Sequence, residues 1–318
     1  MSLTRTSKRL VSLDVLRGIT VCGMILVNNA GACGYAYAPL KHAKWDGFTP
    51  ADLVFPAFMF IMGVSIYLSL NKSNFDWRIS IARILRRTVL IFMSGVALKW
   101  ILAFIATGEY NTLENLRIMG VLQRLGICYG IVALLAVTVR HRLFPTIIAV
   151  LLVGYYLLQL FGNGFEKCAG NIVSMVDYAV LGKSHMYLGG AQFVDPEGVL
   201  STIPAIAQVM IGFLCGKVIV GEKEIRSQIV KLAVWGTSMF VIGYLWSYAA
   251  PLNKRLGGPA VVSEFCFGNL RYHLSDFCDT HLYYRRFEED ALVVSVLGSR
   301  RKSVIDLYIQ RNCRRVIP

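Results

Sequence analysis

The chain has 318 residues, of which 55% are hydrophobic and only 16% charged, and its formal net charge is +14. Soluble domains carry about a quarter charged residues, so this composition, with a mean hydropathy of +0.54, excludes an ordinary soluble globule. The charge does not indicate nucleic-acid binding, because the basic residues form short clusters between apolar runs instead of one polar face. The composition predicts a multi-pass protein embedded in a lipid bilayer.

Seven apolar runs approach the roughly 20 residues that a helix needs to cross a bilayer. No alternating strand pattern competes with them, so we expect an all-α transmembrane helix bundle with about seven spanning helices. The first run resembles a secretory signal, but Asp14 and Arg17 within it favour an uncleaved helix. The predicted spans are residues 10–30, 51–70, 89–107, 118–139, 143–161, 200–220 and 229–249.

The basic residues predict the orientation of these spans. They fall on alternate connections, which the positive-inside rule places in the cytoplasm. The amino terminus is then cytoplasmic, and the connections at 31–50, 108–117 and 162–199 face outside. The clusters are Arg5, Lys8 and Arg9, then Lys72, Arg78, Arg83, Arg86 and Arg87, then Arg140 and Arg142, then Lys223, Arg226 and Lys231.

Ionisable side chains inside the predicted spans need a partner or a cavity, because charge is costly in hydrocarbon. Asp14 and Arg17 are three residues apart on one helix face, so they form either an ion pair or part of a ligand site. Arg124 has only Gln123 as a polar neighbour in sequence. Its expected partner is Asp14, Asp52, or the phosphate or carbonyl of a ligand.

A second set of polar residues gathers at the outer face. Asn28 ends the first predicted span, His42 lies on the connection that follows, and Asp52 opens the second span. A carboxylate at a helix start also satisfies free backbone N–H groups, so Asp52 has a purely structural alternative. No C-x-x-C or Cys/His ligand spacing occurs, and we expect no metal site.

Three stretches carry a resemblance to a known family. "SLDVLRGITVCGMILVNNAG", "PLKHAKWDGFTPADLVFPAFMFIMGVSI" and "LRIMGVLQRLGICY" resemble, in this order, the heparan-alpha-glucosaminide N-acetyltransferases, the lysosomal enzyme and its bacterial relatives. The resemblance covers roughly residues 9–250. Because no large domain precedes the first span, the chain is more similar to the bacterial members, and a bacterial inner membrane is the expected location.

The resemblance implies acetyl transfer from cytosolic acetyl-CoA to the amine of an amino sugar or glycan on the far side. It places the family's active histidine on His42, its helix-end asparagine on Asn28 and its acid on Asp52. His42 acts either as a base toward the amine or as an acetyl carrier, and the sequence leaves both routes open. Coenzyme A phosphates would bind Arg17, Arg124 or the cluster Arg83, Arg86 and Arg87.

Two departures and two other functions remain open at this point. Met119 stands where the family usually has proline, which affects the bend of the fourth helix, and Asp46 stands where asparagine is common. The alternatives are a sugar or anion transporter, which also explains intramembrane charge, and an O-acyltransferase of cell-envelope glycans. The expected partners are the bilayer, acetyl-CoA and the acceptor, with a homodimer as one assembly and nucleic acid excluded.

From Gly257 the chain changes character. The last 62 residues hold nine Lys/Arg and seven Asp/Glu and no run long enough to span a bilayer. We therefore divide the chain into a transmembrane acetyltransferase-like domain, 1–256, and a charged tail, 257–318. The family usually continues into further helices, so we expect the tail to be out-of-frame sequence and the chain to be inactive as given; a genuine soluble tail is the alternative.

Overall fold

The structure, a computed structural model, describes residues 11–29, 37, 40, 49–108, 116–164, 170–186, 195, 197–222 and 224–249. Regular structure in this part of the chain is entirely helical. The proposed boundary at residue 257 and the charged tail lie outside it. The elements are α1 (Val11–Asn28), α2 (Pro50–Asn71), α3 (Trp77–Thr107), α4 (Val121–Thr138), η3 (His141–Leu143), α5 (Phe144–Phe161), α6 (Ile172–Leu181), η4 (Lys183–His185), α7 (Thr202–Gly221) and α8 (Ile225–Ala249).

The helices confirm the predicted all-α membrane architecture. Within the described residues, five helical segments are long and apolar enough to cross a bilayer: α2, residues 77–105 of α3, α4, η3 with α5, and α7. Helices α1 and α8 occupy the positions of the first and last predicted spans. The short helix α6 lies within the long predicted outer connection.

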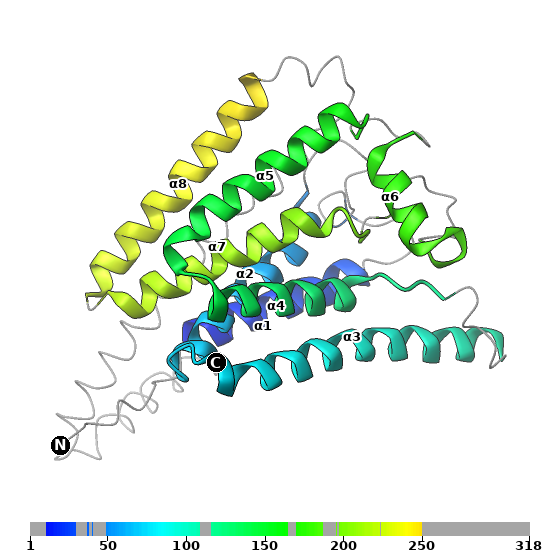
Figure 1. Ribbon diagram of the computed structural model, residues 1–318, viewed down its shortest axis with the longest axis horizontal. Helices are drawn as coiled ribbons and strands as arrows, with labels where there is room; N and C mark the ends of the chain where they lie inside the picture. Colours follow the sequence, from blue (N-terminus) through cyan, green and yellow to red (C-terminus); the bar gives the residue numbers. More distant parts are fainter. Residues whose placement is uncertain are drawn as a thin grey trace, which may run out of the picture.

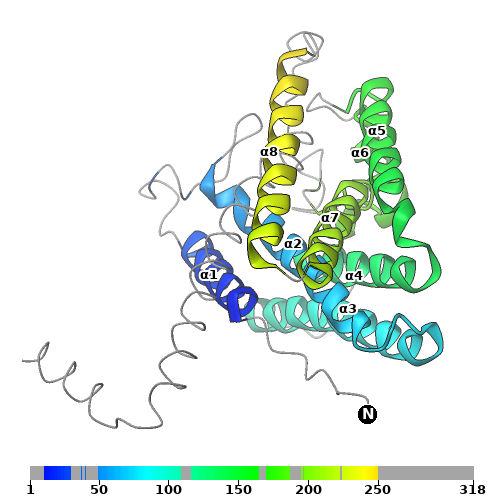
Figure 2. The ribbon, with the colours of Figure 1, turned by 90° about the vertical axis from the view of Figure 1, so that its left-hand side faces the viewer.

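Helices α2 and α7 form the centre of the bundle, and Figure 2 shows the other helices arranged around them. Two glycines allow this close contact. A Cβ atom added at Gly63 of α2 would lie 2.1 Å from the Val209 carbonyl oxygen, and one added at Gly212 of α7 would lie 2.2 Å from the Phe60 carbonyl oxygen. The two backbones therefore touch, and small residues at helix contacts are what permits this in a membrane.

Helix α3 packs mainly on α4 and leaves most of its surface facing outward (Figure 1). It begins at Trp77 and not near the predicted residue 89, because Asp76 caps its first turn by accepting a hydrogen bond from the Arg78 N–H at 2.9 Å. As a result Arg83, Arg86 and Arg87 lie on exposed positions of the helix itself and not on a connection. The predicted start of the fourth span at residue 118 is also early, since α4 begins at Val121.

The two ends of the bundle differ in chemistry. Helices α2, α4 and α7 begin at one end, where α1 and α3 finish, at the right of Figure 1; we call it the Asp52 end. A Cβ atom added at Gly23 of α1 would lie 3.5 Å from Val54 of α2, so α1 and α2 stay paired toward this end. The opposite end, where α3 begins with its arginines, is the Arg86 end. Figure 1 also shows α6 beyond the start of α7, at the Asp52 end.

Candidate functional site at the Asp52 end

The pair α1 and α2 brings two of the three predicted catalytic residues to the same end. Asn28 is exposed in the last turn of α1, and Asp52 is half-buried in the first turn of α2. The Asp52 carboxylate accepts hydrogen bonds from the Thr49 N–H at 3.1 Å and the Thr49 hydroxyl at 2.9 Å. Asp52 therefore caps the amino-terminal end of α2, as the structural alternative predicted. His42 lies outside the described residues, so its place beside Asn28 and Asp52 stays a prediction.

Arg124 is buried near the start of α4, with its residue 6% exposed. Its guanidinium donates to the Gly198 carbonyl at 3.3 Å and to the Ser201 hydroxyl. The guanidinium carbon also lies 5.8 Å from the centre of the Phe55 ring, one turn after Asp52. The predicted hydrogen-bond partners Asp14 and Asp52 were therefore wrong: in the described structure Arg124 bonds to a segment that precedes α7.

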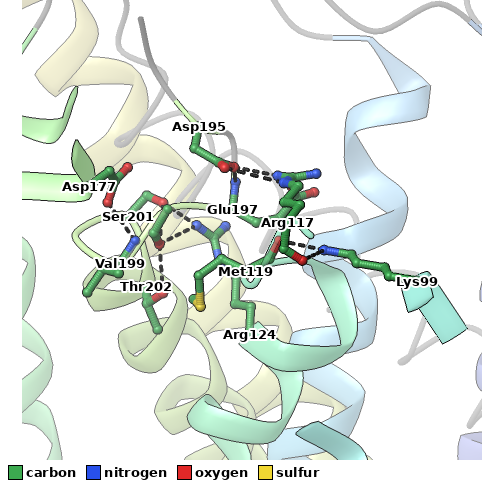
Figure 3. A network of polar contacts seen from close by, with 11 residues as sticks. Lys99, Arg117, Met119, Arg124, Asp177, Asp195, Glu197, Val199, Ser201 and Thr202 are labelled. Atoms are coloured by element: carbon green, nitrogen blue, oxygen red, sulfur yellow. Dashed lines mark hydrogen bonds and ion pairs between the residues drawn. The ribbon is translucent and has the colours of Figure 1, made fainter. Parts of the chain in front are cut away.

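This segment, Asp195 with residues 197–201, is held by a second arginine, and we call it the strap (Figure 3). Arg117 precedes α4 and forms ion pairs with both Asp195 and Glu197. Asp195 is fully buried and accepts from Arg117 Nε at 3.3 Å. Lys99 of α3 in turn donates to the carbonyls of Arg117 and Met119, at 3.3 and 2.6 Å. Arg117 and Arg124 thus tie the strap to the start of α4, and Lys99 of α3 holds the stretch that carries Arg117.

The Met119 carbonyl contact bears on the departure from the family pattern at this position. Residues 116–120 are not helical, and Met119 is buried with its carbonyl bound to Lys99. With methionine in place, α4 therefore begins at Val121 after a non-helical stretch. Asp46, the other departure, lies outside the described residues.

Asp177 of α6 holds the strap from its other side. Its buried carboxylate accepts from the Val199 N–H at 2.7 Å. A Cβ atom at Gly198 would lie 1.8 Å from the second carboxylate oxygen, so only glycine fits against Asp177. Burial raises the pKa of Asp177 to about 6, although the Val199 and Leu200 N–H groups and the Arg124 charge oppose the shift and Asp195 adds to it.

The raised pKa of Asp177 predicts a pH-dependent stability. The ordinary carboxyl pKa is near 3.9, so the folded protein takes up a proton as pH falls from about 6 toward 4, and its stability rises over that interval. Raising the pH through 6 removes this contribution, which for a shift of about two units is at most about 3 kcal/mol. Asp177→Asn keeps the acceptor oxygen but not the charge, so its melting temperature in detergent should vary less between pH 5 and 7 than that of the parent. An equally steep pH profile for both proteins would assign the dependence to another group.

The five predicted coenzyme A arginines do not gather at one place. Arg17 of α1 donates to the Ser65 hydroxyl of α2 at 3.1 Å and lies 3.4 Å from Asp14, as the spacing of Asp14 and Arg17 predicted. Along the axis of α2, Ser65 lies ten residues, or about 15 Å, from Phe55, whose ring Arg124 contacts. One diphosphate cannot reach both arginines, whereas an extended ligand can. Arg83, Arg86 and Arg87 are exposed on α3.

Sequence reasoning gave no role to Lys99, Arg117 or Ser201. Lys99 stands alone inside an apolar run, "SGVALKWILAF", and an ionisable residue at such a position is a signal for a polar network. The strap acids carried no comparable signal, because a loop carboxylate is by default solvated. In the described part of the chain, no group of three or more His, Cys, Asp or Glu side chains could hold a metal ion.

Comparison with known proteins shows to which family this chain is related. The family model described as "Heparan-alpha-glucosaminide N-acetyltransferase, catalytic" matches residues 9–248. The chain belongs to this family. All the predicted site residues, from Arg17 to Arg124, lie within the match to the heparan-alpha-glucosaminide N-acetyltransferase catalytic family.

Two curated members of the family are similar to the chain, and both are named heparan-alpha-glucosaminide N-acetyltransferase. The proteins of Mus musculus and Homo sapiens are each 28% identical to it. The alignments cover 82% and 83% of this chain but 48% of each relative. The chain therefore spans about half the length of the curated relatives it matches. The family match confirms the resemblance drawn from the three sequence stretches.

Proposed function

We propose that this protein is a membrane-embedded N-acetyltransferase that moves an acetyl group from acetyl-CoA to the amine of an amino sugar. The observation that supports this most directly is the match of the catalytic family model over residues 9–248. The structure adds that Asn28 and Asp52 lie at one end of the bundle, together with a buried arginine. The donor arrives from the Arg86 end and the acceptor meets it at the Asp52 end.

The proposed reaction breaks the thioester C–S bond and forms an amide C–N bond. The amine attacks only when neutral, and an imidazole such as His42 has the pKa to take its proton near neutral pH. In the two-step route the imidazole first accepts the acetyl group and then passes it to the amine. In both routes the coenzyme A sulfur leaves as thiolate and is protonated, and the Asn28 amide donates to the oxygen that becomes negative.

Asp52 has a double role in this proposal. Its carboxylate is already oriented by Thr49, so the first turn of α2 is a fixed support. A carboxylate accepts up to about four hydrogen bonds, so Asp52 can hold the His42 ring or a sugar hydroxyl alongside its other contacts. On the donor side, Arg17 and the exposed arginines Arg83, Arg86 and Arg87 supply positive charge for the phosphates of coenzyme A.

His42→Ala should abolish acetyl transfer in detergent-solubilised protein supplied with acetyl-CoA and a panel of amino sugars. The reason is that either route passes through the imidazole. Melting temperature and membrane yield should stay close to those of the parent. Transfer within a few-fold of the parent at saturating substrate would remove His42 from the mechanism. Robust transfer by the parent would also refute the expectation that residues 257–318 make the chain inactive.

The orientation in the membrane has its own test. Tyr37 lies on the connection between α1 and α2 and is 80% exposed, and Lys72 is exposed at the turn between α2 and α3. The positive-inside rule places Tyr37 outside and Lys72 in the cytoplasm. In intact cells, an impermeant maleimide should label Tyr37→Cys above the parent background, and Lys72→Cys only after permeabilisation. The reverse pattern would invert the proposed donor and acceptor sides.

A further inference from the structure

Arg124 has a hydrogen-bonding group that the described fold does not use. Its Nε–H is buried and has no partner among the described residues, while its terminal nitrogen donates to the strap. An unpaired buried donor on a charged group is costly, so proteins rarely leave one without a ligand or water to satisfy it. The guanidinium is thus held at one edge by the strap, while its buried Nε–H is left without a hydrogen-bond partner in the described structure.

The position of Arg124 beside α2 favours a role other than the phosphate binding predicted from sequence. Arg124 contacts Phe55, one turn from Asp52, and Arg17 contacts Ser65 about 15 Å further along α2. A donor that enters from the Arg86 end meets Arg17 and the α3 arginines first. Its phosphates therefore remain far from Arg124, and the part that reaches the Asp52 end is the acetyl thioester.

We propose that Arg124 donates a hydrogen bond to the carbonyl oxygen of the acetyl group, and that the strap residue Ser201 positions Arg124 for this contact. This rests on the proposed acetyltransferase function. The carbonyl oxygen becomes negative when the thioester is attacked, and a fixed guanidinium in a buried site stabilises that charge without having to reorganise. Atoms and electrons balance as in the reaction above, because Arg124 keeps all its protons.

The contacts explain why Ser201 is the positioning residue. Its hydroxyl accepts from Arg124 and donates to the Gly198 carbonyl at 3.1 Å, while Thr202 donates to the same carbonyl at 3.0 Å. Gly198 itself is fixed by Asp177 and has no room for a side chain. The hydrogen-bond acceptors that orient the guanidinium are thus neutral groups, the Ser201 hydroxyl and the Gly198 carbonyl, and not a carboxylate.

The test compares the binding of acetyl-CoA and of free coenzyme A to the purified full chain, since the two ligands differ only in the acetyl group. The parent should bind acetyl-CoA about tenfold more tightly, the ratio expected from one hydrogen bond to a charged group. Arg124→Gln should reduce this preference to about one and leave coenzyme A affinity unchanged. Arg17→Gln, the matched control, should lower the affinity for acetyl-CoA and for coenzyme A by the same factor.

Ser201 is tested in the same way. Ser201→Ala should lose most of the preference for acetyl-CoA, and Ser201→Thr, which restores the hydroxyl, should recover it. Where turnover is measured, Arg124→Gln should lower kcat about 100-fold and raise KM for acetyl-CoA by about the tenfold that is lost in binding. Arg124→Lys keeps the positive charge but lacks the Nε–H. A melting temperature close to that of the parent would show that its loss of preference comes from the missing contact and not from a folding defect.

Each alternative result has a definite meaning. Equal weakening of both ligands by Arg124→Gln would place a phosphate at Arg124 and overturn the inference. An unchanged preference in a folded Arg124→Gln protein would make the arginine purely structural and overturn it as well. Failure of the parent to bind either ligand would instead overturn the proposed function itself, while binding of both with no preference overturns only the role of Arg124.

Discussion

Gly63→Ala should separate the two central helices and lower the stability of the whole bundle. The added methyl group would lie 2.1 Å from the Val209 carbonyl oxygen and 2.8 Å from the Phe213 backbone nitrogen. Both neighbours are backbone atoms of α7, so no side-chain rotation relieves the overlap. Forced overpacking of this kind costs about 3 kcal/mol and more where the backbone must move. We expect a lower melting temperature in detergent and less folded protein in the membrane.

Gly154→Ala is the matched control for this change. Gly154 also lies within a helix, α5, but nothing stands within 4 Å of an added Cβ atom. Its substitution by alanine should leave stability unchanged or raise it slightly through helix propensity, by up to about 1 kcal/mol. Equal melting temperatures for Gly63→Ala and Gly154→Ala would show that α2 and α7 are not in backbone contact.

The membrane class and the order of the helices followed from the sequence because lipid imposes a simple rule. A backbone in hydrocarbon must satisfy its own hydrogen bonds, so apolar length alone identifies most spans. The sequence predicted the ends of the helices less accurately. Helix α3 begins at Trp77, before Arg83 and Arg86, because arginines near a helix end extend their side chains to the polar interface and do not terminate the helix.

The candidate site was predicted only where its residues are local in sequence. The Asp14–Arg17 pair and the capping carboxylate of Asp52 depend on spacings of three residues, which a helix fixes. The partner of Arg124 lies 74 to 77 residues away, on the strap. No pattern within one sequence shows such a pairing. The sequence required some partner for a buried cation, and only the fold identifies it as neutral oxygens.

The same reasoning explains why the strap was missed as a unit. Asp177 lies 18 residues before Asp195 and Glu197 in a polar, glycine-containing segment, and such a segment resembles a solvated connector in sequence. In the fold, Asp177 and Asp195 are fully buried and Glu197 is one-fifth exposed: Arg117 pairs with Asp195 and Glu197, and the strap backbone lies against Asp177. Burial of acids is a tertiary property, and its cost is met by cations from another part of the chain.

Arg117→Gln should therefore be among the most destabilising substitutions outside the helix core. It would leave Asp195, which is fully buried, and Glu197 without the arginine that forms ion pairs with both. Removing one partner of a buried ion pair typically costs about 3–5 kcal/mol, because the remaining charge stays buried. The strap should detach from the start of α4, and proteolysis between α6 and α7 should become faster in detergent.

The ion pair between Lys231 and Glu222, at the Arg86 end, is the control that separates the effect of burial from the effect of the ion pair itself. It is also an ion pair, but the lysine side chain is half exposed and the glutamate about one-third exposed. Lys231→Gln should leave melting temperature and proteolysis unchanged, because solvent screens such a pair. Arg117→Lys, which keeps the charge but not the forked geometry that reaches two acids, should fall between the parent and Arg117→Gln. If Arg117→Gln is as stable as Lys231→Gln, the strap acids have another partner and Arg117 does not hold the strap in place.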